Sequence, residues 1–143
     1  MKEAVMLRAF LLITIGLALL APAARAKTVV VTEAQNGRAV TLVGGDSLVV
    51  RLTVKPGTGR EWHVVYDPQA MLHLNGGINF VSLRNPHSIA APLVVEEFRF
   101  TVPYSRSNFL DRAWLRFLYL SPREPRIESA KVWAIQYTIR PAK

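Results

Sequence analysis

A period of two in the hydrophobic pattern is the feature that most restricts how this chain can fold. In the run SLVVRLTV at positions 47–54, every second residue is apolar, whereas Arg51 and Thr53 fall between them. This alternation is typical of a β-strand with one face in the core and one face in water. Similar runs lie at 28–32, 38–43, 61–66, 78–83, 94–102, 113–120 and 132–139. Beyond residue 26 no run has the 3.6-residue period of an amphipathic helix, and residues 67–74 have room for one helical turn.

Turn sequences separate these runs and indicate how the strands are arranged. Asn36-Gly37 and Gly44-Gly45-Asp46 are both strong turn signals. Seven to eight short strands at this spacing predict an all-β antiparallel sandwich or barrel. Unequal strand lengths and a long connection at 103–112 favour the sandwich. The residues predicted to form its core include Trp62, Phe98, Phe100, Leu115, Phe117, Tyr119 and Trp133.

The first 26 residues have the pattern of a secretory signal peptide. Lys2 and Arg8 precede an apolar run at 9–21, and the segment ends in Ala24-Arg25-Ala26. A charged start, an apolar stretch and a small-x-small end are the parts of a cleavable signal, and the apolar run is shorter than the roughly 20 residues that a transmembrane helix needs. We therefore expect cleavage after Ala26, one β-sandwich domain at 27–143 and a periplasmic or secreted location. An uncleaved anchor is the alternative.

No residue pattern indicates catalysis or a bound cofactor. The chain has no cysteine, which excludes thiol chemistry, disulfides and thiolate metal sites, and its three histidines are dispersed. The sequence GGDSL at 44–48 lacks the flanking glycine of a nucleophile elbow. The adjacent carboxylates Glu96 and Glu97 lie in a predicted strand and should point to opposite faces. We expect a protein that is not an enzyme and binds neither metal nor cofactor.

The formal net charge of +8 allows nucleic acid, an anionic surface or an acidic protein as partner. The arginines are scattered singly along predicted strands and no nucleic-acid-binding motif is present, which argues against nucleic acid. Stable membrane insertion is not expected once the signal is removed. Binding to an anionic surface stays open as a minor hypothesis, and the sequence does not predict an oligomeric state.

The loop KPGTGR at 55–60 joins two predicted strands and has more glycine than a turn requires. Gly57 and Gly59 flank Thr58, as if to present a small side chain at a tip, and Trp62 follows. Within VTEAQNGRAVTLVGGDSLVVRLTVKPGTGREWHVVYD, this loop resembles that of the chagasin-like cysteine protease inhibitors, where Asn-Pro-Thr-Thr-Gly-aromatic follows a strand and precedes a tryptophan. The resemblance extends more weakly through EEFRFTV and LRFLYLSP, over roughly residues 29–139. It implies an immunoglobulin-like antiparallel β-sandwich.

In that family, three loops at one end of the sandwich plug the cleft of papain-like enzymes. The resemblance therefore implies protease-binding residues in three segments: Pro56, Gly57, Thr58, Gly59 and Arg60; Ala90 and Ala91; Ser121, Pro122 and Arg123. Thr58 corresponds to the threonine that lies beside the catalytic cysteine–histidine pair. The chain departs from the family pattern at Gly57 and Arg60, has no glycine in its second loop at 89–92, and has no tryptophan in its third.

The predicted function is an exported inhibitor that blocks the cleft of papain-like cysteine proteases without covalent chemistry. Aromatic anchors usually dominate interfaces of this kind, and the altered second and third loops lack them. A second hypothesis therefore stays open, in which the chain is a periplasmic protein-interaction module on the same fold that has lost protease inhibition.

Overall fold

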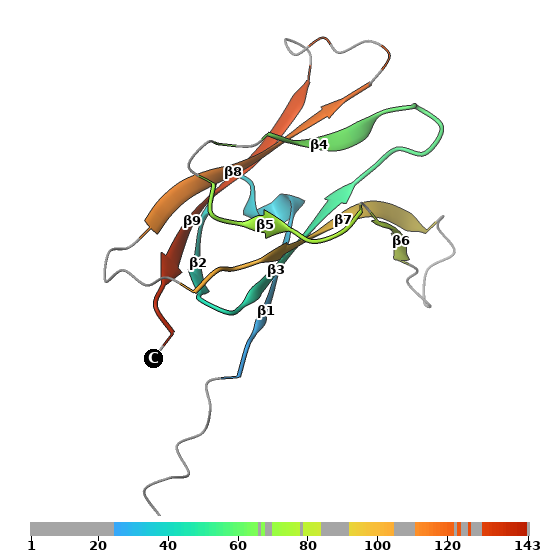
Figure 1. Cartoon of the computed structure of the whole chain (residues 1–143). Coiled ribbons are helices and arrows are strands. Elements are labelled where there is room, and N and C mark those ends of the chain that lie inside the picture. The colour runs from blue at the N-terminus through green and yellow to red at the C-terminus, as the bar shows by residue number, and fades with distance from the viewer. Residues whose placement is uncertain are drawn as a thin grey trace, which may run out of the picture.

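The chain is built from short strands. The computed structural model describes residues 25–65, 67, 70–77, 79–83, 92–104, 111–121, 123, 126 and 130–142. These residues form nine strands and one 3₁₀ helix (Figure 1). The elements are β1 (Thr28–Thr32), η1 (Glu33–Gln35), β2 (Ala39–Val43), β3 (Ser47–Thr53), β4 (Glu61–Val65), β5 (His73–Leu74), β6 (Asn79–Leu83), β7 (Leu93–Thr101), β8 (Asp111–Leu120) and β9 (Lys131–Arg140). Every predicted strand is present within two residues of its expected ends.

The strands form two facing sheets. One sheet has the order β1–β3–β7–β5, with β6 also paired to β7, and the other has the order β2–β9–β8–β4. The first four strands alternate between the sheets, so the chain crosses from one layer to the other at each of their connections. The predicted immunoglobulin-like β-sandwich is confirmed.

Two details of the sandwich differ from the prediction. The described residues form nine strands rather than seven to eight, because β5 is a two-residue strand, too short to produce an alternating pattern. The sheets are mixed rather than purely antiparallel, since β1 pairs with β3 and β2 with β9 in parallel. Parallel pairing follows from the alternation between layers: β1 and β2 lie in different sheets and cannot form a hairpin. Asn36-Gly37 is a turn as predicted, but it docks on β9, where the Gly37 N–H donates to the Ala134 carbonyl at 2.7 Å.

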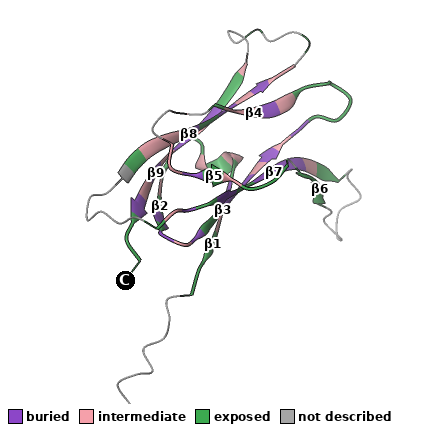
Figure 2. Ribbon diagram, in the orientation of Figure 1, coloured by how far each residue is buried: buried purple, intermediate pink, exposed green. Residues whose placement is uncertain are grey.

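The core lies between the two sheets and consists of the predicted alternating residues (Figure 2). Phe117 lies at its centre, with its ring centroid 4.7 Å from that of Phe98 and 5.6 Å from that of Trp133. Both contacts are edge-to-face, the arrangement that aromatic quadrupoles favour. The seven residues predicted for the core are all buried: Trp62, Phe98, Phe100, Leu115, Phe117, Tyr119 and Trp133.

The adjacent carboxylates of β7 point to opposite faces, as predicted. Glu97 faces outward but is only 3% exposed, because Arg51 and Arg99 both form ion pairs with it. Burial alone would raise the pKa of Glu97, but the hydrogen bonds and charges of the two arginines outweigh that effect and hold the pKa below its usual value. Glu97 therefore stabilises the outer face of this sheet as a carboxylate.

Candidate functional site

One end of the sandwich gathers the three connections that the sequence singled out. In one sheet, the ends of β3 and β6 lie beside the start of β7. In the other sheet, the end of β8 lies beside the starts of β4 and β9. The β3–β4, β6–β7 and β8–β9 connections therefore leave their sheets at the same end of the molecule, as the resemblance implied. We call this the loop end.

The β3–β4 loop is exposed from Lys55 to Arg60. Gly57 and Gly59 have φ angles of 80° and 66°, a left-handed conformation in which a side chain would be strained. The hydroxyl of Thr58 donates to the carbonyl of Lys55 at 2.7 Å, and the N–H of Arg60 donates back to that hydroxyl at 3.4 Å. The side chain of Thr58 thus braces the loop from within, in contrast to the free tip that the sequence suggested.

Two aromatic side chains fix the base of this loop to both sheets. The Lys55 N–H donates to the hydroxyl of Tyr119 in β8 at 3.0 Å, and the indole N–H of Trp62 in β4 donates to the carbonyl of Thr53 in β3 at 3.0 Å. The two rings contact each other, with centroids 5.0 Å apart. Because the loop is tied at its base to buried side chains, little backbone freedom remains there to be lost on binding.

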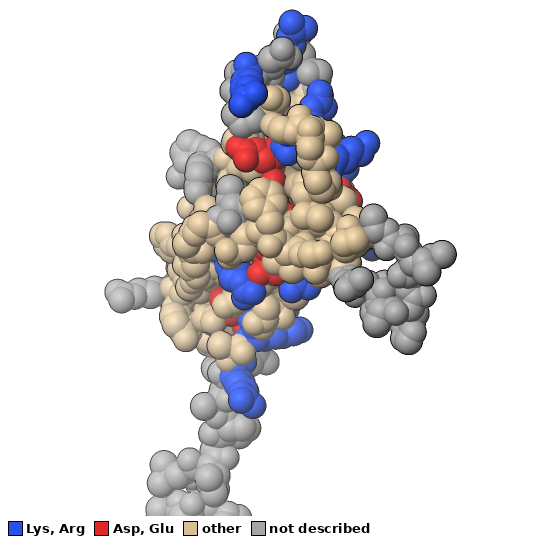
Figure 3. Space-filling model, turned by 90° about the vertical axis from the view of Figure 1, so that its right-hand side faces the viewer, with Lys and Arg blue, Asp and Glu red and all other residues tan. Residues whose placement is uncertain are grey.

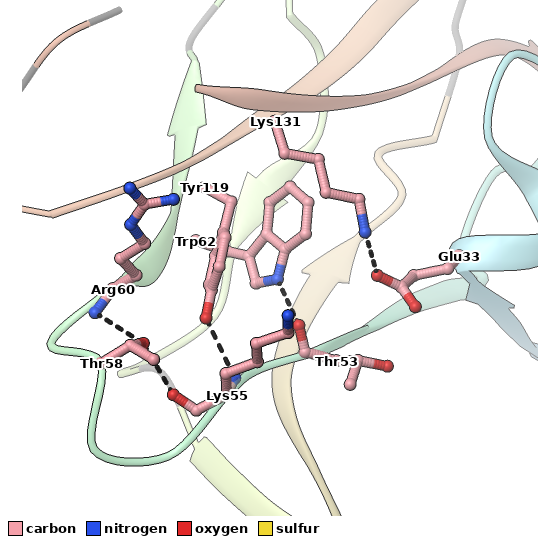
Figure 4. Close-up of a pocket in the computed structure, with 8 residues that line it drawn as sticks. All are labelled: Glu33, Thr53, Lys55, Thr58, Arg60, Trp62, Tyr119 and Lys131. Carbon is pink, nitrogen blue, oxygen red and sulfur yellow. Dashed lines mark hydrogen bonds and ion pairs between the residues drawn. The ribbon is translucent and has the colours of Figure 1, made fainter. Parts of the chain in front are cut away.

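A hollow of about 580 Å³ lies on one side of the loop (Figure 4). The rings of Trp62 and Tyr119 lie between basic side chains, and the ammonium of Lys131 lies 5.5 Å from the Trp62 ring centroid. Lys131 also forms an ion pair with Glu33 of η1 at 2.8 Å. We call this the cationic hollow, and its lining residues are Glu33, Thr53, Lys55, Thr58, Arg60, Trp62, Tyr119 and Lys131.

A smaller hollow of about 280 Å³ lies on the other side of the loop. Its wall opposite the loop is formed by Phe80 of β6 and Val94 of β7. Phe80 is 63% exposed, an unusual position for a large aromatic side chain. Lys55 and Arg60 line this hollow as well, and Phe80 and Val94 distinguish its lining from that of the cationic hollow.

A buried carboxyl lies beneath the loop end. Glu96 of β7 points into the sandwich and is fully buried. Its Oε2 accepts the backbone N–H of Trp62 at 2.8 Å, whereas its Oε1 has no hydrogen-bond partner in the described part of the chain. Burial raises the pKa of Glu96 to about 7 against the opposing effect of the Trp62 hydrogen bond, and the charge of Glu61 adds to the rise.

The structure brings some of the predicted site residues together. Residues 56–60 form the exposed part of the β3–β4 loop, and Ser121 and Arg123 follow the end of β8 at the same end of the sandwich. Arg123 is exposed. Ala90, Ala91 and Pro122 lie outside the described residues, so their predicted roles stay predictions.

Three residues at this end were not singled out from the sequence. Most residues of β6 are exposed, so the position of Phe80 in the hydrophobic pattern does not indicate a binding role. Glu33 and Lys131 are 98 residues apart in the chain. No local spacing could have indicated that they meet beside the loop.

The described residues offer no centre for metal chemistry. Within them, no group of three or more His, Cys, Asp or Glu side chains comes together. No helix in the same ranges is long and apolar enough to cross a bilayer. What the loop end does offer is shape and charge for binding another molecule.

Basic side chains dominate the exposed surface of the loop end. Figure 3 shows Lys and Arg gathered at the upper end of the molecule, with a second group toward the lower end. The exposed basic residues that the structure places at the loop end include Lys55, Arg60, Arg123 and Lys131. A surface of this sign attracts acidic partners.

Comparison with known proteins identifies the fold. No family model and no curated protein matches the sequence. Among solved structures, the cysteine protease inhibitor EhICP2 from Entamoeba histolytica superposes with a TM-score of 0.64 at 17% identity, over 81% of this chain and 98% of that one. The chain has the fold of a cysteine protease inhibitor. The solution structure of amebosin is also similar, with a TM-score of 0.54 at 14% identity over 81% of this chain and 99% of that one.

The resemblance to the chagasin-like inhibitors is thus confirmed at the level of the fold. EhICP2 is itself a cysteine protease inhibitor, a binding protein rather than an enzyme. At these identities the likeness concerns the scaffold, and the function has to be argued from the loop end.

Proposed function

We propose that the chain is an exported inhibitor of papain-like cysteine proteases, which inserts its β3–β4 loop into the active-site cleft without covalent chemistry. The observation that carries this proposal is the loop itself: an exposed Pro-Gly-Thr-Gly segment, tied at its base to Tyr119 and Trp62, on the fold of a known inhibitor. A loop that is already ordered loses less conformational entropy on docking than a flexible one.

The glycines suit a narrow cleft. Nothing lies within 4 Å of where a Cβ would stand at Gly57 or Gly59, so the main chain is open on those sides. An enzyme can therefore approach the backbone closely at these two positions. The internal hydrogen bonds of Thr58 keep the loop in this shape.

Phe80 supplies an apolar contact of the kind that the altered third loop lacks. It stands beside the loop on the side of the smaller hollow and is largely exposed. Large aromatic side chains often contribute most of the binding energy at protein interfaces. We assign to Phe80 the role of an anchor against the wall of the cleft.

Inhibition of papain by the purified chain tests the proposal. The parent should inhibit papain at micromolar concentration or better. Thr58→Arg should abolish inhibition, because the long side chain breaks the loop's internal hydrogen bonds and places a charge at the narrowest point of the protease cleft. Thr41→Arg is the matched control, since Thr41 is an exposed strand residue at the opposite end of the sandwich. Circular dichroism should show the same fold in all three proteins.

The interaction-module hypothesis keeps one observation in its favour. Arg60 stands where the family loop has an aromatic residue, and an exposed arginine places a charge beside the inserted segment. If the parent does not inhibit papain or a cathepsin-like enzyme at micromolar concentration, the inhibitor proposal fails and this second function takes its place.

A further inference from the structure

Two positive side chains of the β3–β4 loop form no ion pair with any residue that the structure describes. Lys55 and Arg60 are both exposed, and in the described part of the chain neither takes part in an ion pair. Arg51 and Arg99, on the outer face of the sheet, are by contrast both paired with Glu97. Exposed cations elsewhere, such as Arg140, also lack an ion pair among the described residues, so what distinguishes Lys55 and Arg60 is that both line one hollow.

Both side chains belong to the same concave site. Lys55 and Arg60 line the cationic hollow together with Lys131, and Glu33 is the one acidic side chain among the described lining residues (Figure 4). Glu33 already neutralises Lys131 at 2.8 Å. Counted over the described residues that line it, the hollow therefore has two more positive charges than negative ones, and the loop supplies both of the cations that have no ion pair.

The lining strengthens the attraction for an anion. The inner wall is formed by the rings of Trp62, which is fully buried, and Tyr119, which is 8% exposed. Charges next to such apolar walls are screened less than charges on an open surface. Thr53 and Thr58 are further residues of the same lining.

We propose that the cationic hollow binds a carboxylate side chain, aspartate or glutamate, of a partner protein. The identity of the partner rests on the proposed function: the acidic residue then belongs to the rim of the protease cleft, beside the point where the β3–β4 loop enters. The hollow is concave and lies to one side of a protruding loop, which suits a projecting side chain better than a flat anionic membrane. The site selects among proteases by the charge of their rim.

A short acidic peptide tests the site without any protease. The probe is a tetraglutamate peptide with blocked ends, titrated at low salt while the NMR signal of the Trp62 indole N–H is followed. The signal should shift with the tetraglutamate and not with a tetraglutamine peptide. Replacing both cations, as Lys55→Gln with Arg60→Gln, should weaken binding by about tenfold or more, as expected for loss of partly desolvated charge pairs. Arg140→Gln at the opposite end is the matched control and should change nothing.

Glu33→Gln gives a test of opposite sign. This variant removes the one acidic side chain found among the described lining residues and releases Lys131 from its ion pair, so the tetraglutamate should bind more tightly than to the parent. No shift at Trp62, equal weakening by Arg140→Gln, or weaker binding by Glu33→Gln would each overturn the proposal. Binding of phosphatidylglycerol vesicles that depends on Lys55 and Arg60, without binding of the peptide, would assign the site to membranes instead.

Inhibition assays then connect the site to the proposed function. Against the protease that the parent inhibits best, Lys55→Glu and Arg60→Glu should each raise the inhibition constant by about tenfold, and Arg140→Glu should raise it by less than about threefold. The loss should shrink at high salt. If the parent inhibits and the three variants behave alike, the hollow is not the subsite. If the parent inhibits nothing, the proposed function fails, and the peptide titration still decides whether the hollow binds carboxylates.

Discussion

Glu96 is the residue whose surroundings differ most from those its chemistry favours. A carboxylate in the interior of a sandwich is destabilising unless charge or hydrogen bonds compensate for lost hydration. Glu96 has one compensating bond, from the N–H of Trp62, and one oxygen without a partner in the described residues. Trp62 also fixes the base of the β3–β4 loop, so the protonation state of the Glu96 carboxyl affects a residue that positions the loop end.

Glu96→Gln should make the folded chain more stable at high pH. The pKa of Glu96 is about 7 when folded, against 4.5 for an ordinary glutamate, so the folded state holds a proton that the unfolded state releases. The contribution of Glu96 to stability is therefore fully present below about pH 4.5 and is lost as the pH rises through 7. Glutamine stays neutral and avoids that loss, which is on the order of 3 kcal/mol above pH 8. Urea unfolding of both proteins between pH 4.5 and 8.5 measures the difference.

Glu97→Gln is the control for this experiment, because its effect has the opposite sign. The pKa of Glu97 is lowered by Arg51 and Arg99, so its stabilising effect exists above the ordinary carboxyl pKa and disappears as the solution becomes more acidic. The glutamine variant should be less stable than the parent at neutral pH and approach it in acid. Parallel pH curves for the two variants would contradict the assignment of Glu96 as the proton-holding group.

At the scale of elements, the pairing of β6 with β7 places Phe80 beside the β3–β4 loop. β6 pairs with the N-terminal half of β7, and this register places Phe80 opposite Glu96, on the face of the sheet that is turned toward β4. Strand geometry therefore puts an exposed aromatic ring at the edge of the sandwich next to the loop. The same strand has little buried surface, so its exposed ring does not serve the core.

Phe80→Ala should weaken protease inhibition while leaving stability nearly unchanged. Loss of an exposed aromatic anchor at an interface corresponds to about 1–3 kcal/mol of binding free energy, whereas a side chain that is 63% exposed contributes little to folding. Tyr104→Ala is the matched control, since Tyr104 is 72% exposed and lies by the Gly44–Asp46 turn at the opposite end. Inhibition constants and thermal midpoints would be measured for all three proteins. Equal inhibition by Phe80→Ala and the parent would exclude Phe80 as an anchor.

The elements themselves could largely be read from the sequence, and their partners could not. A hydrophobic pattern with a period of two indicates which face of a strand is buried. The ends of strands such as the one predicted at 47–54 agree with the structure within one or two residues. The same period says nothing about which strand lies alongside, so the parallel pairing of β1 with β3 and of β2 with β9 was missed. β5 was missed because two residues cannot alternate.

The site was predictable only where it is local in sequence. The two glycines of the β3–β4 loop indicate a backbone conformation that other residues rarely adopt, and both have positive φ angles in the structure. The contents of the two hollows depend on long-range pairing: Lys131 meets Glu33 across 98 residues, and Phe80 reaches the loop through the register of β6 with β7. The inward carboxyl of Glu96 followed from the alternation, but its bond to Trp62 required the three-dimensional fold.

At the scale of the whole molecule, the two ends of the sandwich present different groups. Lys55, Arg60 and Phe80 lie at the loop end, whereas the start of β1 and the end of β9 lie at the other end (Figure 1). If the expected signal peptide is cleaved after Ala26, the cleavage site therefore lies at the opposite end of the sandwich from the loops that we propose to bind a partner.

The fold holds a position ready for a new N-terminus at Lys27. The backbone N–H of Lys27 donates to Oδ1 of Asp46 at 2.9 Å, and Asp46, which is 6% exposed, also accepts the N–H of Val43 at 3.1 Å. If the expected signal peptide is removed after Ala26, this nitrogen becomes an ammonium group facing a nearly buried carboxylate. A hydrogen bond in which only the acceptor is charged is then replaced by an ion pair between an ammonium and a carboxylate.

Export should therefore yield a chain that begins at Lys27 and is more stable than one that keeps Ala26. Sequencing of the exported protein identifies the cleavage site, and a Met1 start in the soluble exported fraction would contradict cleavage. Urea unfolding at pH 6 compares chains starting at Lys27, at Ala26 and at an acetylated Lys27, and the first should gain about 1 kcal/mol over the other two. Asp46→Asn should remove most of that advantage, because the ammonium then faces a neutral amide. If the three chains that keep Asp46 are equally stable, the new terminus points into solvent instead of toward that carboxylate.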